Sequence, residues 1–219
     1  MRLFRLWPLP TGPITPDLIA VRILTVNFFL LRHTRGWLAI DAGFGAPLIR
    51  RELKRLGIQS NEITDVVLTH TDLDHAGGLG VFPAANVWLP AAEVDLINHV
   101  CARLFGVFYN GRIRRPYRLL QPDEVVEIAG FSLRCLATPG HTIGSMSYLV
   151  NEEWLFAGDA FKLIDGQVSA LRGYINMDSA MMKRSIRGLA NLTGVKLAIT
   201  GHTGLTRTFD SDIASWRET

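Results

Sequence analysis

The feature that most constrains this chain is a cluster of four potential metal ligands directly after a short apolar segment. Residues 65–69, Asp-Val-Val-Leu-Thr, have the composition of a buried β-strand. They are followed at once by His70, Asp72, Asp74 and His75, and then by an Ala-Gly-Gly sequence. A short loop can turn imidazoles and carboxylates toward one centre, and small residues let the backbone and a helix start approach closely. The fold therefore has to present this loop at a strand end, where it can serve two metal ions.

Three other candidate ligands stand in the same setting, each just after a predicted strand. His141 ends the sequence Ala-Thr-Pro-Gly-His, whereas Asp159 and His202 each follow a glycine. The strands that precede them are residues 131–137, 153–157 and 195–200. We expect the four strand ends to converge on one edge of the fold. The remaining histidines, His33 and His99, occur in no motif and are interpreted as packed or solvated residues.

Strand-like and helix-like segments alternate along the chain, and no low-complexity segment or Gly/Ser linker divides it. With 219 residues, 48% of them hydrophobic, the sequence can form the core of one domain, which we place at residues 1–219. Segments 37–43 and 154–160 are alike, each a Trp-led apolar strand ending at an Asp, and indicate two similar halves. The other predicted strands are residues 21–31, 37–41, 86–89, 125–129 and 145–150. The predicted helices are residues 47–56, 91–105 and 179–192. Asp178 is the predicted N-cap of the last helix.

Charge and composition exclude several classes of function. The formal net charge of +3 is too small to favour a nucleic-acid partner without a concentrated basic patch. The most apolar stretch, residues 21–31, is interrupted by polar residues and is shorter than the roughly 20 residues of a membrane-spanning helix. Residues 1–16 contain four prolines and lack the apolar stretch of a secretory signal, and Cys101 and Cys135 have no paired spacing. We therefore expect a cytoplasmic protein with free thiols, a small-molecule substrate and no membrane partner.

The order of the motifs resembles the metallo-β-lactamase superfamily. The resemblance rests on Thr-His-x-Asp-x-Asp-His-x-Gly-Gly from residue 69, Pro-Gly-His-Thr-x-Gly-Ser from residue 139, Gly-Asp at 158–159 and Gly-His at 201–202. It extends from about residue 21 to residue 205. It implies an α/β fold, a four-layer αββα sandwich, with the metal site at one edge of two facing sheets. Asp41, at the end of its predicted strand, resembles the first motif of the family, usually a supporting aspartate.

The resemblance also implies a ligand assignment with two divalent metal ions. The first ion would be held by His70, Asp72 and His141, the second by Asp74, His75 and His202, with Asp159 bridging the two. Asp72 departs from the family pattern, because most members have a histidine there. A carboxylate adds negative charge and hardens the site, so iron and manganese become candidates beside zinc, and the flavodiiron branch, which has a carboxylate here, holds two irons. In the alternative, Asp72 swings away or hydrogen-bonds a neighbour, and one ion remains.

Two cations that hold one solvent molecule predict hydrolysis. A metal ion can lower the pKa of bound water from about 15.7 to about 7, so that hydroxide can attack a carbonyl or phosphorus at neutral pH. In this interpretation Asp74 is also catalytic, orienting the nucleophile and accepting its proton. The predicted function is a metal-dependent hydrolase of small esters, lactones or thioesters. The alternatives are a phosphodiesterase, a β-lactam hydrolase, an iron-based redox enzyme and a ligand-binding module.

The most basic stretch of the chain lies between the first ligand cluster and His141. Residues 103–118 contain five arginines, several aromatic residues and no acidic residue. We predict a lid in which one or more of Arg112, Arg114 and Arg115 hold an anionic group of the substrate, as guanidinium does well for carboxylate or phosphate. A solvated basic loop or a subunit contact is the alternative.

Overall fold

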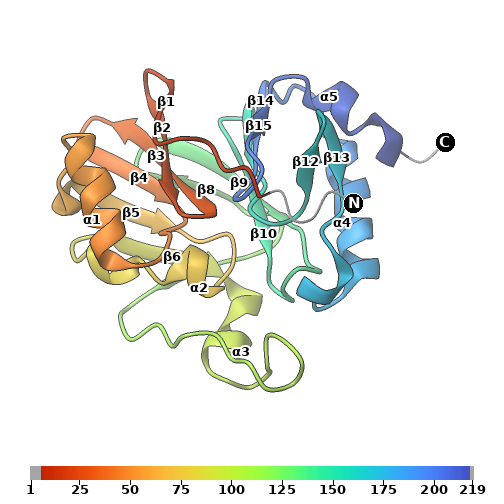
Figure 1. The fold of residues 1–219 in the computed structure, drawn as a ribbon, viewed down its shortest axis with the longest axis horizontal. Helices are drawn as coiled ribbons and strands as arrows, with labels where there is room; N and C mark the ends of the chain where they lie inside the picture. The colour runs from red at the N-terminus through yellow and green to blue at the C-terminus, as the bar shows by residue number, and fades with distance from the viewer. Residues whose placement is uncertain (1–5, 218–219) are drawn as a thin grey trace.

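The structure, a computed structural model, describes residues 6–217 and has two facing β-sheets with helices on the outside (Figure 1). The first sheet contains seven strands whose spatial order follows the sequence. They are β1 (Gly12–Thr15), β2 (Leu18–Ile23), β3 (Val26–His33), β4 (Gly36–Ile40), β5 (Ile63–Val67), β6 (Asn86–Pro90) and β7 (Arg118–Leu120). From β1 to β4 neighbouring strands are antiparallel, whereas β4 to β7 are parallel. The carboxyl ends of β4 and β5 therefore lie at the same edge of the sheet.

The second sheet contains six strands in the order β15-β14-β11-β10-β9-β8. They are β8 (Val125–Ile128), β9 (Phe131–Ala137), β10 (Met146–Val150), β11 (Trp154–Phe156), β14 (Leu197–Ile199) and β15 (Leu205–Thr206). Strands β11 and β14 are parallel neighbours, so the loops that follow them leave the sheet at the same edge. A separate antiparallel pair, β12 (Lys162–Ile164) and β13 (Gln167–Ser169), follows β11.

Helices cover the outer faces of both sheets. Figure 1 shows α1 outside the first sheet and α4 outside the second. The α-helices are α1 (Ala46–Arg55), α2 (Leu73–Ala76), α3 (Val94–Ile97), α4 (Ser179–Ala190) and α5 (Phe209–Asp212). The 3-10 helices are η1 (Ser60–Glu62), η2 (Leu79–Val81), η3 (Ala91–Glu93), η4 (Gly173–Ile175) and η5 (Ala214–Trp216).

Three apolar clusters separate four layers. Successive side chains of a strand point to opposite faces of its sheet, so in β3 Phe28 belongs to the cluster beneath α1 and Phe29 to the cluster between the sheets. A third cluster joins Met182 of α4 to Leu155 of β11. This helix–sheet–sheet–helix arrangement is the predicted αββα sandwich.

Two of the three predicted helices are confirmed, as α1 and α4. The carboxylate of Asp178 caps α4 by accepting a hydrogen bond from the Met181 amide at 2.8 Å. The predicted helix over residues 91–105 is wrong beyond Ile97. His99 and Phe105 have φ angles of 63° and 53°, and a left-handed backbone cannot continue an α-helix.

The single strand predicted over residues 21–31 is two strands, β2 and β3, which pair as a hairpin with Ile23 opposite Val26. The chain reverses at Leu24 and Thr25, where Leu24 has a φ of 54°. Tight hairpin turns favour Asn, Asp or Gly at such positions. The Leu-Thr pair carries no turn signal, so the sequence did not indicate the reversal.

The cysteines and the two histidines outside the motifs lie apart from the predicted metal ligands. Cys101 and Cys135 are free cysteines. His33 Nε2 lies 3.0 Å from a threonine hydroxyl, and His99 Nε2 lies 2.9 Å from the backbone carbonyl of Asn110. Within residues 6–217, no helix combines the length and apolar character needed to cross a membrane.

Candidate metal centre

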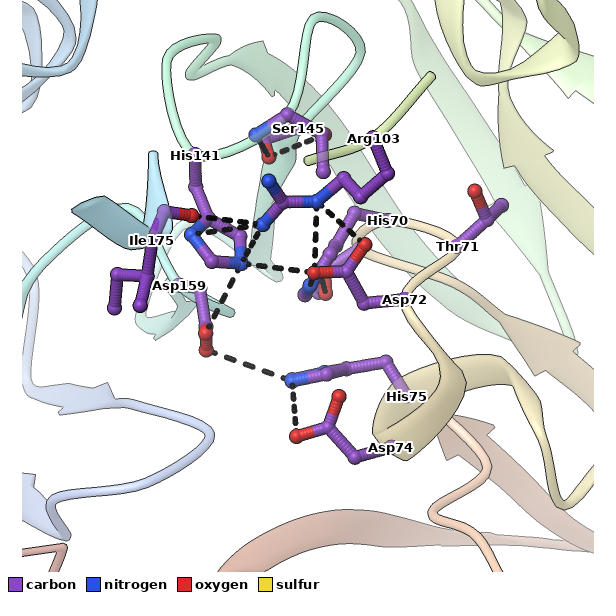
Figure 2. Close-up of polar contacts among 12 residues, drawn as sticks. His70, Thr71, Asp72, Asp74, His75, Arg103, His141, Ser145, Asp159 and Ile175 are labelled. Carbon is purple, nitrogen blue, oxygen red and sulfur yellow. Dashed lines mark hydrogen bonds and ion pairs between the residues drawn. The ribbon is translucent and has the colours of Figure 1, made fainter. Parts of the chain in front are cut away.

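The loops after β5, β9, β11 and β14 bring all seven predicted ligands to one edge of the sandwich. Figure 2 shows six of them around a common centre, with their polar atoms turned inward. Their donor atoms form three groups, each with all atoms within 4.8 Å of one another: His70, Asp72 and His141; His70, His75 and Asp159; and Asp74, His75 and His202. The sequence prediction that these strand ends converge is therefore confirmed, whereas the role of each residue is a separate question.

The second metal position has the spacing of a coordination sphere. His202 Nε2 lies 3.3 Å from His75 Nε2, 3.3 Å from Asp159 Oδ2 and 3.4 Å from Asp74 Oδ2. Around a tetrahedral zinc ion with bonds of about 2.0–2.1 Å, neighbouring ligand atoms are about 3.3–3.4 Å apart. These four side chains therefore fit a metal ion.

The hydrogen bonds of both rings leave their Nε2 lone pairs free for this ion. His202 Nδ1 donates to the carbonyl of Thr25 at 2.7 Å, and His75 Nδ1 lies 2.8 Å from Asp41 Oδ2. When each ring carries a single proton, on Nδ1, both Nε2 atoms are acceptors that face each other. Two facing acceptors need a proton or a metal ion between them, and a metal ion there would gain two nitrogen ligands.

Asp41 contacts His75 at the second position, but it is not one of the residues whose donor atoms could surround a metal ion. Its buried carboxylate also accepts hydrogen bonds from Thr69, from the amide at 2.7 Å and from the hydroxyl at 2.9 Å. A carboxylate behind a metal-bound imidazole fixes the ring orientation and raises its basicity. Asp41 therefore has the supporting position that the family resemblance implied.

Charge complementarity also favours a cation at this position. Burial lowers the pKa of His75, but the carboxylates of Asp41, Asp74 and Asp159 outweigh it and raise that pKa to about 10. Burial raises the pKa of Asp159, yet the neighbouring His202 and His75 hold it well below its usual range. The carboxylates thus create a strongly negative environment that either a proton or a metal ion can neutralise.

The first metal position has similar ligand spacing. His141 Nε2 lies 3.2 Å from Asp72 Oδ2, and His70 Nε2 lies 3.7 Å from the same oxygen. His70 Nε2 is buried and has no hydrogen-bond partner among residues 6–217. Burial and the neighbouring His75 lower the pKa of His70 well below its usual value, so its ring is neutral and can act as a ligand.

An arginine that was not predicted from the sequence lies within this first position. Arg103 Nε donates to Asp72 Oδ1 at 2.7 Å and to Oδ2 at 2.9 Å, and Arg103 Nη2 donates to His141 Nε2 at 2.9 Å. Figure 2 shows the guanidinium between these two side chains. Nη2 also donates to the carbonyl of Ile175 at 3.0 Å, and the side chain is only 5% exposed. The only sequence signal was that Arg103 begins the basic stretch.

A buried glutamate, also not predicted, joins the loops that carry the first position. Glu93 Oε2 accepts hydrogen bonds from the Thr71 amide at 2.7 Å and hydroxyl at 2.5 Å. Its Oε1 accepts from the Thr142 hydroxyl at 2.6 Å and the Gly144 amide at 3.1 Å. Because Thr71 adjoins Asp72 and Thr142 adjoins the histidine ligand of the other loop, Glu93 fixes their separation. No local motif indicates this role, since the partners are far apart in sequence.

The three arginines predicted to bind an anionic group are not brought to the predicted metal ligands. Arg112, Arg114 and Arg115 line a separate cavity of about 330 Å³ beside α2. The Arg115 guanidinium donates to the carbonyl of Phe82 at 2.8 Å and also to that of Ala85. These backbone contacts hold Arg115 in place and occupy donors of its guanidinium, which explains why it does not reach the predicted metal ligands.

A pocket of about 790 Å³ is lined by five of the seven predicted metal ligands. Asp72, Asp74, His141, Asp159 and His202 form its polar floor together with Arg103. Its apolar wall includes Leu104, Phe161, Leu163, Leu171, Ile175 and Leu205. Such a combination of an apolar wall and a few convergent polar groups is typical of small-molecule sites.

Comparison with known proteins agrees with this geometry. Residues 21–211 match the family model of the metallo-beta-lactamase superfamily. The chain belongs to this superfamily. A solved structure of a metallo-beta-lactamase family protein from Thermus thermophilus superposes with a TM-score of 0.71 at 23% identity, over 93% of this chain and 79% of that one. This likeness confirms the fold predicted from the sequence.

Two curated relatives are named as hydrolytic enzymes. A hydroxyacylglutathione hydrolase of Rhodopseudomonas palustris is 31% identical over 147 residues, which are 65% of this chain and 51% of that protein. An N-acyl homoserine lactonase AttM of Rhizobium johnstonii is 26% identical over 216 residues, with 82% of each chain covered. The match to the first relative thus spans about half of that relative's length.

Proposed function

We propose that the protein is a metal-dependent hydrolase of small esters, lactones or thioesters. The observation that carries the proposal is the pair of Nε2 atoms of His75 and His202, which face each other at 3.3 Å, with His202 lining the pocket. Nitrogen and oxygen donors at this spacing suit zinc. When bound, the metal supplies a Lewis acid and activates water for attack.

In this proposal Asp74 moves the proton of the attacking water. Its side chain is 35% exposed and lines the pocket, whereas Asp159 is 6% exposed. One oxygen of Asp74 lies 3.4 Å from His202 Nε2, which fixes the carboxylate next to the second metal position. A carboxylate held at the pocket floor can orient water and accept its proton as the nucleophile attacks.

The pocket walls favour a substrate with an apolar body. Leu163 and Leu171 contribute side chains near the β12–β13 hairpin, and Leu104 and Ile175 contribute them beside Arg103. An apolar wall binds an acyl chain or a lactone ring, while the polar floor receives the bond to be broken. The relatives support this class, because one is named a hydroxyacylglutathione hydrolase and the other an N-acyl homoserine lactonase.

The test is a substrate panel on protein loaded with zinc, manganese or iron, with bound metal measured by elemental analysis. We expect turnover of acyl lactones or thioesters, and loss of turnover and metal in His202→Ala. His99→Ala is the matched control, since it removes an imidazole outside every donor group. Turnover of a phosphodiester or β-lactam alone would contradict the proposed substrate class, and no turnover by fully metal-loaded protein would contradict hydrolysis of these substrates.

A further inference from the structure

The first metal position contains a permanent cation of the protein itself. Arg103 contacts both oxygens of Asp72 and the Nε2 atom of His141, which are two of the three expected ligands there. We propose that the Arg103 guanidinium takes the place of the first metal ion, so that the chain binds one ion, at the second position. This inference rests on the proposed metal-dependent function and changes its expected metal content.

The position of the guanidinium at His141 is the first reason. A neutral imidazole has one nitrogen that accepts and one that donates, and the accepting nitrogen has a single lone pair. Arg103 Nη2 has only protons to offer, and it lies 2.9 Å from His141 Nε2 and 3.4 Å from Nδ1 of the same ring, so the guanidinium lies against the face of the imidazole. His141 Nδ1 also faces the side-chain oxygen of Asn176 at 3.4 Å. A metal ion bound to His141 would therefore lie directly beside a fixed positive charge.

The charge of Asp72 is the second reason. Its carboxylate is paired with a guanidinium that stays charged at any accessible pH, and it also accepts from Asn110 Nδ2 at 3.2 Å. A divalent ion at the first position would lie next to this fixed positive charge, and the repulsion between like charges is large where water is excluded. The negative charge that would attract the ion is already neutralised.

The surroundings hold Arg103 in this place. The side chain is 5% exposed, and the Ile175 carbonyl accepts from Nη2 at 3.0 Å. Breaking a buried ion pair by removing one partner leaves an uncompensated charge, which strongly favours keeping the pair intact. The unpartnered Nε2 of His70 does not require a first ion, because it also belongs to the donor group with His75 and Asp159. A metal ion held near these three side chains can bind the Nε2 atom of His70.

The pair also accounts for the carboxylate at position 72. A histidine there would place an imidazole against the guanidinium with no negative charge to balance it. Asp72 and Arg103 therefore form one unit, in which the acidic residue matches the arginine rather than a metal ion. The pocket floor keeps two cations, one metal ion and one guanidinium, and the guanidinium gives a fixed positive charge beside the bound substrate.

The test is the number of ions bound per chain. Wild-type protein, Arg103→Leu and the double variant Asp72→His/Arg103→Leu are dialysed against buffered Zn²⁺ or Co²⁺ and measured by elemental analysis and by Co²⁺ absorption spectra. We expect one ion in the wild type and a second in the double variant, whose first position then has three imidazoles. We expect Arg103→Leu to gain a weaker second ion. Arg134→Leu, which removes another arginine–carboxylate pair, at Glu152, is the matched control and should keep one ion.

Two tightly bound ions in the wild type, with both affinities unchanged in Arg103→Leu, would overturn the inference. If Arg103→Leu does not fold, the wild-type count alone decides, since one ion supports the inference and two contradict it. The outcome is separate from that of the proposed function. Hydrolysis by a wild-type protein that binds two ions would support the proposed function and reject the inference. A wild-type protein that binds one ion but is inactive on the substrate panel would support the inference and reject the proposed function.

Discussion

The two halves of the candidate metal centre contain similar residues at similar spacing, yet they differ in which lone pairs are free. In the second position, Asp41 and the Thr25 carbonyl hold the Nδ1 atoms of both rings, so the Nε2 atoms of His75 and His202 face each other and can share a metal ion. In the first position, an arginine side chain lies against the ring of His141, 2.9 Å from its Nε2 atom. Ligand type and distance are therefore insufficient to identify a metal site, because the hydrogen bonds behind each ligand determine what it can bind.

The largest expected effect is the loss of metal in His202→Ala. The ring contributes one of the two facing acceptors, so its removal should weaken metal binding by more than about 100-fold, since changes to residues behind the ligands alone cost about 10–100-fold. Titration with Zn²⁺ in the presence of a competing chelator measures this affinity. His141→Ala makes the equivalent change at the first position and should weaken Zn²⁺ binding less. Equal loss of Zn²⁺ affinity in the two variants would contradict the proposed difference between the two positions.

A smaller effect is expected for Asp41→Asn, which changes the residue behind His75. The amide keeps the size of the side chain but loses the charge that orients the ring and raises its basicity, so metal affinity should fall by about 10–100-fold. The same chelator titration measures it, with circular dichroism to check the fold. Unchanged affinity would show that the support of Asp41 is structural only.

Glu93→Gln should lower the free energy of unfolding, because Glu93 joins the loops of the first position, and should leave metal binding at the second position unchanged. The amide group would face donors that now bond to a carboxylate, and one unsatisfied buried donor costs about 1–3 kcal/mol of unfolding free energy. Urea denaturation measures the loss, and Zn²⁺ affinity should stay close to that of the wild type. Glu153→Gln, at a partly exposed glutamate paired with Lys196, is the control and should cost less than about 1 kcal/mol. A large loss of metal affinity in Glu93→Gln would contradict the separation of the two positions.

The smallest effect is expected for Arg114→Ala. This exposed arginine lines the separate cavity beside α2, so kcat/KM on an anionic substrate should stay within about twofold of the wild type. Steady-state kinetics with matched anionic and neutral substrates measures it. A selective loss on the anionic substrate would instead support the lid predicted from the sequence and would place a third cationic group at the pocket.

The sequence by itself determined the architecture and the seven candidate ligands. Apolar segments such as residues 65–69 end directly at ligand-type residues and predicted the common edge, whereas the sandwich was implied by the resemblance of these motifs to the metallo-β-lactamase superfamily. These features are local, because strand composition and the residues that follow a strand lie within one short window. The same local reasoning failed at Leu24, where a hairpin turn has no turn residues, and beyond Ile97, where helical spacing continues but the helix ends.

Only the tertiary structure decided how the ligands are used. Arg103 reaches Asp72 and His141 across separations of 31 and 38 residues, and Glu93 reaches Thr142 across 49. The carbonyl that orients His202 belongs to Thr25, 177 residues away. Long-range hydrogen bonds of this kind depend on how the two sheets pack and leave no periodic signal in the sequence. The residue types at the metal centre could therefore be predicted, whereas the availability of their lone pairs could not.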